Sequence, residues 1–147
     1  MRTEAATHSL RLTRVVQASP ERVFRALTDP AELKQWFCPE GGTVKEVDVD
    51  LTIGGRFRVV MAMPNGDHEA AGVYREIEPP RRVVSTWSWL GDDDMPGDET
   101  LLTFELESRD GATEVVLTHE RLPSAESRDS HESGWASALN RLEALFG

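Results

Sequence analysis

The last stretch of the chain, from Ser124 to Phe146, constrains the fold more than any other. Its apolar residues recur at spacings of three and four, at Trp135, Ala138, Leu139, Leu142, Leu145 and Phe146. This periodicity is typical of an amphipathic helix, which would be about 34 Å long at the usual rise per residue. Nearly everything before it has the pattern of strands and turns. The apolar side of this helix must therefore pack on the sheet that those strands form.

Short alternating segments, separated by turn residues, predict about seven antiparallel strands. They cover residues 8–18, 43–50, 56–63, 68–77, 82–90, 99–107 and 113–120. Asn65-Gly66 is a strong hairpin signal, because this pair adopts positive φ at little cost. In the fourth segment the parity of Tyr74 is inconsistent with that of Ile77, which a β-bulge between them would explain.

Two short helices are predicted after the first strand, at Ser19-Pro20 and at Asp29-Pro30. Each pair places a capping side chain before a proline that fits the first helical position. Helices of about two turns are not stable alone, so both must pack on the sheet. We therefore predict an α+β fold in which a curved antiparallel sheet wraps the long C-terminal helix.

Composition limits the classes of function. The 147 residues are expected to form one domain, 1–147, with residues 1–7 as a loose leader. The net charge of −10 argues against binding to nucleic acid or to an anionic membrane surface. One cysteine, Cys38, allows no internal disulfide and no cysteine-cluster metal site. The chain shows neither a signal peptide nor an apolar run of about 18 residues, so a cytoplasmic location is expected.

The space between the helix and the sheet is the predicted site, because alternation turns one face of the strands toward the helix. A largely apolar cavity with a few polar groups is the usual form of a small-molecule site. The alternative is that the same side chains simply fill the core. The predicted ligand-binding residues are Trp36, Phe57, Val59, Met61, Tyr74, Trp87, Trp89, Phe104, Leu117, His119, His131, Trp135 and Leu139.

Two histidines are the most informative polar residues of this set. His119 continues the inward parity of its strand, and His131 lies four residues before Trp135 on the helix. Their imidazoles could orient a ligand or transfer a proton. The alternative is that each bonds a backbone carbonyl or a carboxylate at the cavity mouth. Gly134, in the middle of the helix, is expected to allow close approach to the sheet or room for a ligand; the alternative is that glycine is simply tolerated there.

No cofactor and no metal are expected. Trp135 stands where a zinc-binding His-Glu-x-x-His motif starting at His131 would need its second histidine. The acidic run of residues 92–99 lacks the spacing of an EF-hand, so it is expected to be a solvated loop. Cys38 is given no catalytic role, because nothing near it in sequence indicates an activated thiol.

Several motifs, taken in order, resemble one superfamily. They are Phe24–Pro30, Leu33 with Trp36-Phe37, Gly54–Phe57, Gly72–Pro80, Thr86-Trp87, Glu99–Leu101, Leu117–Glu120, His131 and Gly134-Trp135. The set resembles the SRPBCC superfamily, which shares the helix-grip fold of START and birch-pollen-allergen proteins. Within it, the chain is most similar to the branch named after the activator of the heat-shock-protein-90 ATPase. The resemblance extends over about residues 8–146 and implies the helix-grip fold.

The superfamily includes lipid carriers, hormone receptors, polyketide cyclases and chaperone activators, so the resemblance leaves three hypotheses. The first is non-catalytic binding of a hydrophobic or aromatic small molecule in the cavity. The second is a cyclase-like or hydrolase-like enzyme that uses His119 or His131 as acid or base. The third is a cofactor of a chaperone ATPase, with the chaperone as partner and a role in the stress response, which rests on the branch name alone.

Overall fold

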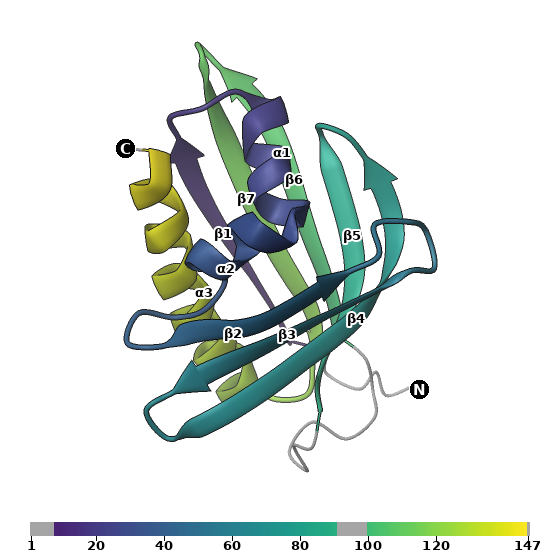
Figure 1. The fold of residues 1–147 in the computed structure, drawn as a ribbon, viewed down its shortest axis with the longest axis vertical. Helices are drawn as coiled ribbons and strands as arrows, with labels where there is room; N and C mark the ends of the chain where they lie inside the picture. The colour runs from purple at the N-terminus through teal and green to yellow at the C-terminus, as the bar shows by residue number, and fades with distance from the viewer. Residues whose placement is uncertain (1–7, 91–99, 147) are drawn as a thin grey trace, which may run out of the picture.

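The computed structural model describes residues 8–90 and 100–146, and Figure 1 shows their arrangement. The elements follow the predicted order closely. They are β1 (His8–Val16), α1 (Pro20–Thr28), α2 (Pro30–Trp36), β2 (Thr43–Val49), β3 (Arg56–Met63), β4 (Gly66–Glu78), β5 (Arg82–Leu90), β6 (Thr100–Arg109), β7 (Ala112–Leu122) and α3 (Ala125–Phe146).

Within the described residues, seven strands form one antiparallel sheet in the order β1-β7-β6-β5-β4-β3-β2. From β2 to β7 each strand pairs with the next along the chain. The last strand, β7, also pairs with the first, β1, and Leu12 of β1 lies opposite Leu117 of β7. Together with the two short helices and the long α3, this sheet confirms the predicted α+β helix-grip fold.

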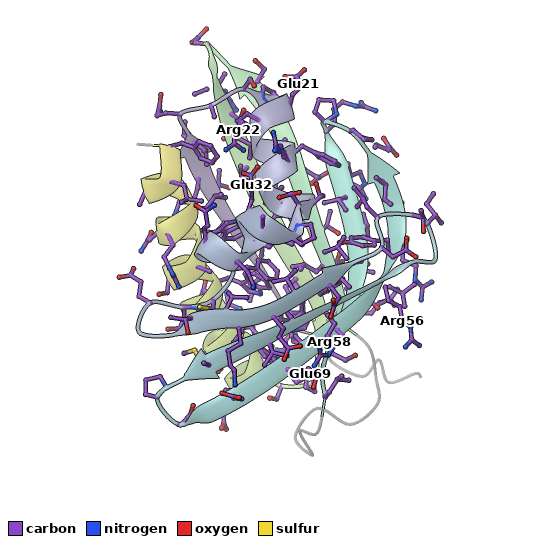
Figure 2. The ribbon with its side chains drawn as sticks, viewed as in Figure 1. Glu21, Arg22, Glu32, Arg56, Arg58 and Glu69 are labelled. Atoms are coloured by element: carbon purple, nitrogen blue, oxygen red, sulfur yellow. The ribbon has the colours of Figure 1, made fainter. Side chains whose placement is uncertain are left out.

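The two short helices begin where their capping residues predict. Side-chain oxygens of Ser19 and Asp29 each accept the backbone N–H three residues further on, which caps α1 and α2. The helices are then joined to each other. Glu32 of α2 forms an ion pair with Arg22 of α1 (Figure 2), and the Trp36 indole N–H donates to a backbone carbonyl of α1 at 2.9 Å.

The pairing of β4 with β5 contains the predicted irregularity. The register shifts between Tyr74 and Glu76, which confirms the β-bulge. Nearby, Gly72 allows the strands to approach closely. An added Cβ there would lie 1.9 Å from the Thr86 carbonyl oxygen and 2.5 Å from a ring carbon of Phe57. Phe57 therefore packs over the backbone of β4 on the inner face of the sheet.

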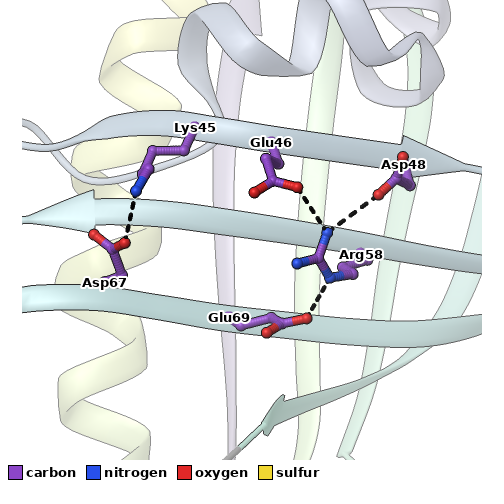
Figure 3. Close-up of polar contacts among 6 residues, drawn as sticks. All are labelled: Lys45, Glu46, Asp48, Arg58, Asp67 and Glu69. Carbon is purple, nitrogen blue, oxygen red and sulfur yellow. Dashed lines mark hydrogen bonds and ion pairs between the residues drawn. The ribbon is translucent and has the colours of Figure 1, made fainter.

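The outer face of β2–β4 is charged. Arg58 of β3 contacts the carboxylates of Glu46 and Asp48 on β2, both at 3.2 Å, and that of Glu69 on β4 (Figure 3). On the other side of the strand, Phe57, Val59 and Met61 are buried. Because polar residues occupy the outer face, a site for an apolar ligand belongs on the inner face, toward α3.

The long helix α3 begins after Ser124, whose hydroxyl accepts a backbone N–H of the first turn at 3.0 Å. It packs along β1, where Arg14 and Glu143 form an ion pair at 3.1 Å. Arg141 donates to the carbonyl of Cys38 at 3.2 Å, which ties α3 to the segment after α2. In Figure 1 the N-terminal half of α3 passes behind β2–β4.

Two predictions fall on residues that the structure does not describe. The leader, residues 1–7, and the acidic run, residues 92–99, lie outside the described residues. In the part that is described, no helix is both long enough and apolar enough to cross a membrane. The same residues contain no group of three or more His, Cys, Asp or Glu side chains placed to hold a metal ion.

Candidate ligand-binding cavity

A cavity of about 860 Å³ lies between the N-terminal half of α3 and the inner face of β3–β5. This volume is in the range that small-molecule sites commonly occupy, about 300–1,000 Å³. The lining residues are Phe37, Cys38, Pro39, Met61, Met63, Asn65, His68, Trp87, Trp89, Pro123, Ser124, Glu126, Ser127, Ser130, His131, Gly134, Trp135 and Ala138.

The inner end of the cavity is aromatic and buried. The Trp87 and Trp135 rings lie with their centroids 5.1 Å apart, and the Phe37 ring lies 5.5 Å from that of Trp135. Trp87 is 1% exposed and Trp135 is 6% exposed. Both ring pairs are tilted, and contacts of this kind between aromatic rings help to fix the orientation of each ring. Met61 and Ala138 complete this end, so a ligand there meets a preformed apolar wall.

The outer end of the cavity is polar. Asn65 and His68 come from the β3–β4 hairpin, and Ser124, Glu126 and Ser130 come from the start of α3. All five side chains are exposed, so the cavity opens at this end. Among the described lining residues Glu126 is the only carboxylate, and there is no lysine or arginine. The rim therefore offers hydrogen bonds but no positive charge.

His119 lies behind the aromatic wall and is fully buried. Its Nδ1 accepts the indole N–H of Trp135 at 3.0 Å, and its Nε2 donates to the Thr100 hydroxyl at 2.7 Å. That hydroxyl in turn donates to the Trp87 carbonyl at 2.6 Å. Because an indole nitrogen only donates, Nδ1 carries no proton and the ring is neutral. Burial, with a smaller effect of nearby His131, lowers the pKa of His119 to about 3.

His131 lines the cavity and has the opposite tautomer. Its Nδ1 donates to the Ser127 carbonyl at 2.7 Å, and its Nε2 accepts the indole N–H of Trp89 at 2.9 Å. The ring centroids of His131 and His119 are 5.0 Å apart. His131 thus bonds a backbone carbonyl, as one of the two interpretations predicted. His119 does not, because its partners are the side chains of Thr100 and Trp135.

The four tryptophans differ in whether the indole N–H has a hydrogen-bond acceptor. Trp36, Trp89 and Trp135 each donate their indole N–H to an acceptor at 2.9–3.0 Å. The indole N–H of Trp87 is buried and has no acceptor among the described residues. Since nearly all buried polar groups are paired, this one needs an explanation.

The structure places the thirteen predicted site residues in two groups. Met61, Trp87, Trp89, His131 and Trp135 line the cavity. The others are buried in the core around it: Trp36, Phe57, Val59, Tyr74, Phe104, Leu117, His119 and Leu139. Strand parity identifies the inner face but not the depth at which each side chain lies.

Sequence reasoning missed most of the rim and the start of α3. Ser127, His131, Gly134 and Ala138 follow one another at spacings of four, three and four, so they continue the inner face of the helix. Three of these four are small. Small side chains on the face of a helix that should be apolar are the signal that could have indicated a cavity there.

Of the reasons expected for Gly134, close approach to the sheet is not what the structure shows, and the glycine lines the cavity instead. The nearest atom to an added Cβ would be Cγ of Pro39, at an ordinary contact distance of 3.7 Å, and Pro39 lies in the segment after α2. Cys38, next to it, also lines the cavity. Its sulfur accepts a hydrogen bond from Arg141 at 3.0 Å, and burial raises the pKa of the thiol.

Comparison with known proteins gives the family. A family model described as Activator of Hsp90 ATPase homolog 1-like protein matches residues 17–147. The crystal structure of the AHSA1 protein from Silicibacter pomeroyi is 36% identical, with a TM-score of 0.82, over 93% of this chain and 96% of that one. A protein from Chromobacterium violaceum is 31% identical, with a TM-score of 0.86, over 94% and 96%.

A third structure, CalU16 from Micromonospora echinospora, is 26% identical, with a TM-score of 0.71, over 95% of this chain and 76% of that one. Among proteins of curated function none matches the chain. The family match covers nearly all the described residues, and the helix-grip architecture agrees with it. The chain belongs to the family of activator of Hsp90 ATPase homolog 1-like proteins.

Proposed function

We propose that this protein binds a hydrophobic or aromatic small molecule in the cavity between α3 and the sheet. The observation that carries the proposal is the cavity itself, about 860 Å³ with a buried aromatic end and an open polar rim. A planar apolar ligand that enters it would contact the rings of Trp87 and Trp135. Each Å² of apolar surface removed from water contributes about 25 cal/mol, so this contact would supply most of the affinity.

Binding without catalysis fits the two histidines best. A general base needs an accessible lone pair within hydrogen-bond reach of the proton that it removes. The lone pair of His119 accepts the Trp135 indole N–H, and that of His131 accepts the Trp89 indole N–H. With a pKa of about 3, His119 would also take no proton near neutral pH. The chaperone hypothesis rests on the family name, and fold alone does not determine function.

The test uses N-phenyl-1-naphthylamine, a neutral dye whose fluorescence rises in apolar surroundings. The purified protein should bind it saturably at one site. The variant Gly134→Leu places a large side chain on the cavity wall, so binding should weaken by about tenfold or more. The matched control is Ala144→Leu, on an exposed position of the same helix outside the cavity.

The control should bind the dye as the wild type does. Circular dichroism of both variants should show that the fold is retained. Absence of saturable binding by the wild type would overturn the proposal. So would equal binding by the wild type and a folded Gly134→Leu variant.

A further inference from the structure

The aromatic wall of the cavity contains one buried polar group without a partner, the indole N–H of Trp87. The ring lines the cavity, is 1% exposed, and its nitrogen has no acceptor among the described residues. Rings surround it at centroid distances of 5.1 Å for Trp135, 5.3 Å for Trp89 and 5.9 Å for Phe37. An unpaired donor in such surroundings is costly, because it has lost its hydrogen bonds to water.

The polar groups close to Trp87 are already occupied. Nδ1 of His119 accepts the indole N–H of Trp135, and Nε2 of His119 is itself a donor. The carbonyl of Trp87 accepts the Thr100 hydroxyl. Nε2 of His131 accepts the indole N–H of Trp89. The described residues thus supply a partner for the indole N–H groups of Trp89 and Trp135 and none for that of Trp87.

We infer that the ligand is a neutral, planar aromatic molecule with a hydrogen-bond acceptor, a carbonyl or ether oxygen or a ring nitrogen, at its inner end. This inference rests on the proposed function, because it specifies the ligand of the same cavity. The acceptor pairs with the Trp87 indole N–H, and the rings of Phe37 and Trp135 contact the aromatic body. A carboxylate or phosphate would meet Glu126 and neither lysine nor arginine among the lining residues that the structure describes.

The test compares fluorenone with fluorene, which share a ring system and differ in one carbonyl group. In the wild type, fluorenone should bind about tenfold more tightly, the ratio that about 1.4 kcal/mol produces. The Trp87 indole N–H resonance in a ¹⁵N correlation spectrum should move downfield with fluorenone and stay nearly unchanged with fluorene. The other three indole signals, already hydrogen bonded, should move much less.

Two variants isolate the N–H group. Trp87→Phe should abolish the preference for fluorenone, while Phe37→Leu, which removes another aromatic ring from the lining and frees no polar group, should weaken both ligands and keep their ratio. If Trp87→Phe does not fold, incorporation of β-(3-benzothienyl)alanine at position 87 replaces the N–H by sulfur and keeps the ring shape. The protein with this amino acid at position 87 should also bind fluorenone and fluorene equally.

The outcomes separate the two proposals. If neither ligand binds, the proposed function fails and the inference fails with it. If both bind equally in the wild type, the cavity does take aromatic molecules, but a water molecule or a neighbouring ring face satisfies the Trp87 N–H and the inference is overturned. A preference for fluorenone that survives replacement of the Trp87 N–H would also overturn it.

Discussion

The two halves of α3 carry one continuous inward stripe but pack in different ways. In the C-terminal half, Leu139 and Leu142 are fully buried in the core. In the N-terminal half, the inward residues before Trp135 are small or polar, namely Ser127, His131 and Gly134, and they line a cavity. The periodicity of a helix therefore tells which face is turned inward, while the volume of the side chains on that face decides whether the interior is filled.

The largest effect on stability is expected in the C-terminal half of α3, where the inward side chains fill the core. Leu142→Ala should lower the free energy of unfolding by about 2–5 kcal/mol, because it removes buried methyl groups and leaves a void in a packed region. Urea denaturation measures the change. The matched control, Leu145→Ala, alters a leucine that is 37% exposed on the same half and should cost much less. Equal losses in the two variants would contradict the distinction between a buried and an exposed side of this half.

The next largest effect on stability concerns His119, which lies behind the aromatic wall of the cavity. The pKa of His119 is lowered from 6.5 to about 3 in the folded protein. Between these values the unfolded chain holds a proton on this residue that the folded protein does not, so folding becomes less favourable as the pH falls. The slope from this residue is about 1.4 kcal/mol per pH unit. Urea denaturation at a series of pH values across this window measures it.

His119→Gln provides the control for that slope. Glutamine cannot titrate, yet it can still donate to the Thr100 hydroxyl as the imidazole Nε2 does. Carboxylates titrate in both proteins, so the difference between the two slopes isolates the imidazole. The variant should have the flatter dependence from pH 6.5 downward. Identical slopes would mean that His119 is not held neutral by its buried surroundings.

Much of the fold follows from local signals. The two Ser/Asp-Pro pairs, the Asn65-Gly66 turn and the alternating strands each act within a few residues of the chain, and the structure has the elements there. The predicted ends of the strands were less accurate than the predicted elements themselves. The last strand, expected over 113–120, is Ala112–Leu122, because pairing with its neighbours extends it beyond its own alternating pattern.

The site was less predictable, because it depends on contacts between distant parts of the chain. Strand parity identified Trp87 as inward, and the helical spacing of apolar residues did the same for Trp135. Neither pattern could separate a cavity wall from the core behind it. The pairing of Trp135 with His119 joins α3 to β7. Whether Trp87 finds an acceptor among the described residues depends on where β5, β6 and α3 meet. No short segment of sequence carries that information.

A smaller effect is expected in the open half of α3. Gly134→Ala should raise the free energy of unfolding by up to about 1 kcal/mol, the helix-propensity difference between the two residues. Among the described residues, the nearest atom to the new Cβ would be Pro39 Cγ, at an ordinary contact distance of 3.7 Å, so no strain is expected to offset the gain. Thermal and urea denaturation measure it, with Ser133→Ala at an exposed neighbouring position as the comparison. Destabilisation by Gly134→Ala would show that this half of the helix is packed as tightly as the other.

The smallest effect is expected at the rim, where the open half of α3 meets solvent. Glu126→Gln should weaken binding of a cationic aromatic probe such as proflavine by less than about threefold at physiological salt, because an exposed charge is screened there. Binding of neutral N-phenyl-1-naphthylamine should not change. Asp129→Asn, an exposed acid of the same helix outside the cavity, is the control and should affect neither probe. A loss of about tenfold or more in proflavine binding alone would mean that Glu126 acts in an enclosed, poorly solvated space. The N-terminal half of α3 would then border a closed chamber rather than an accessible cavity.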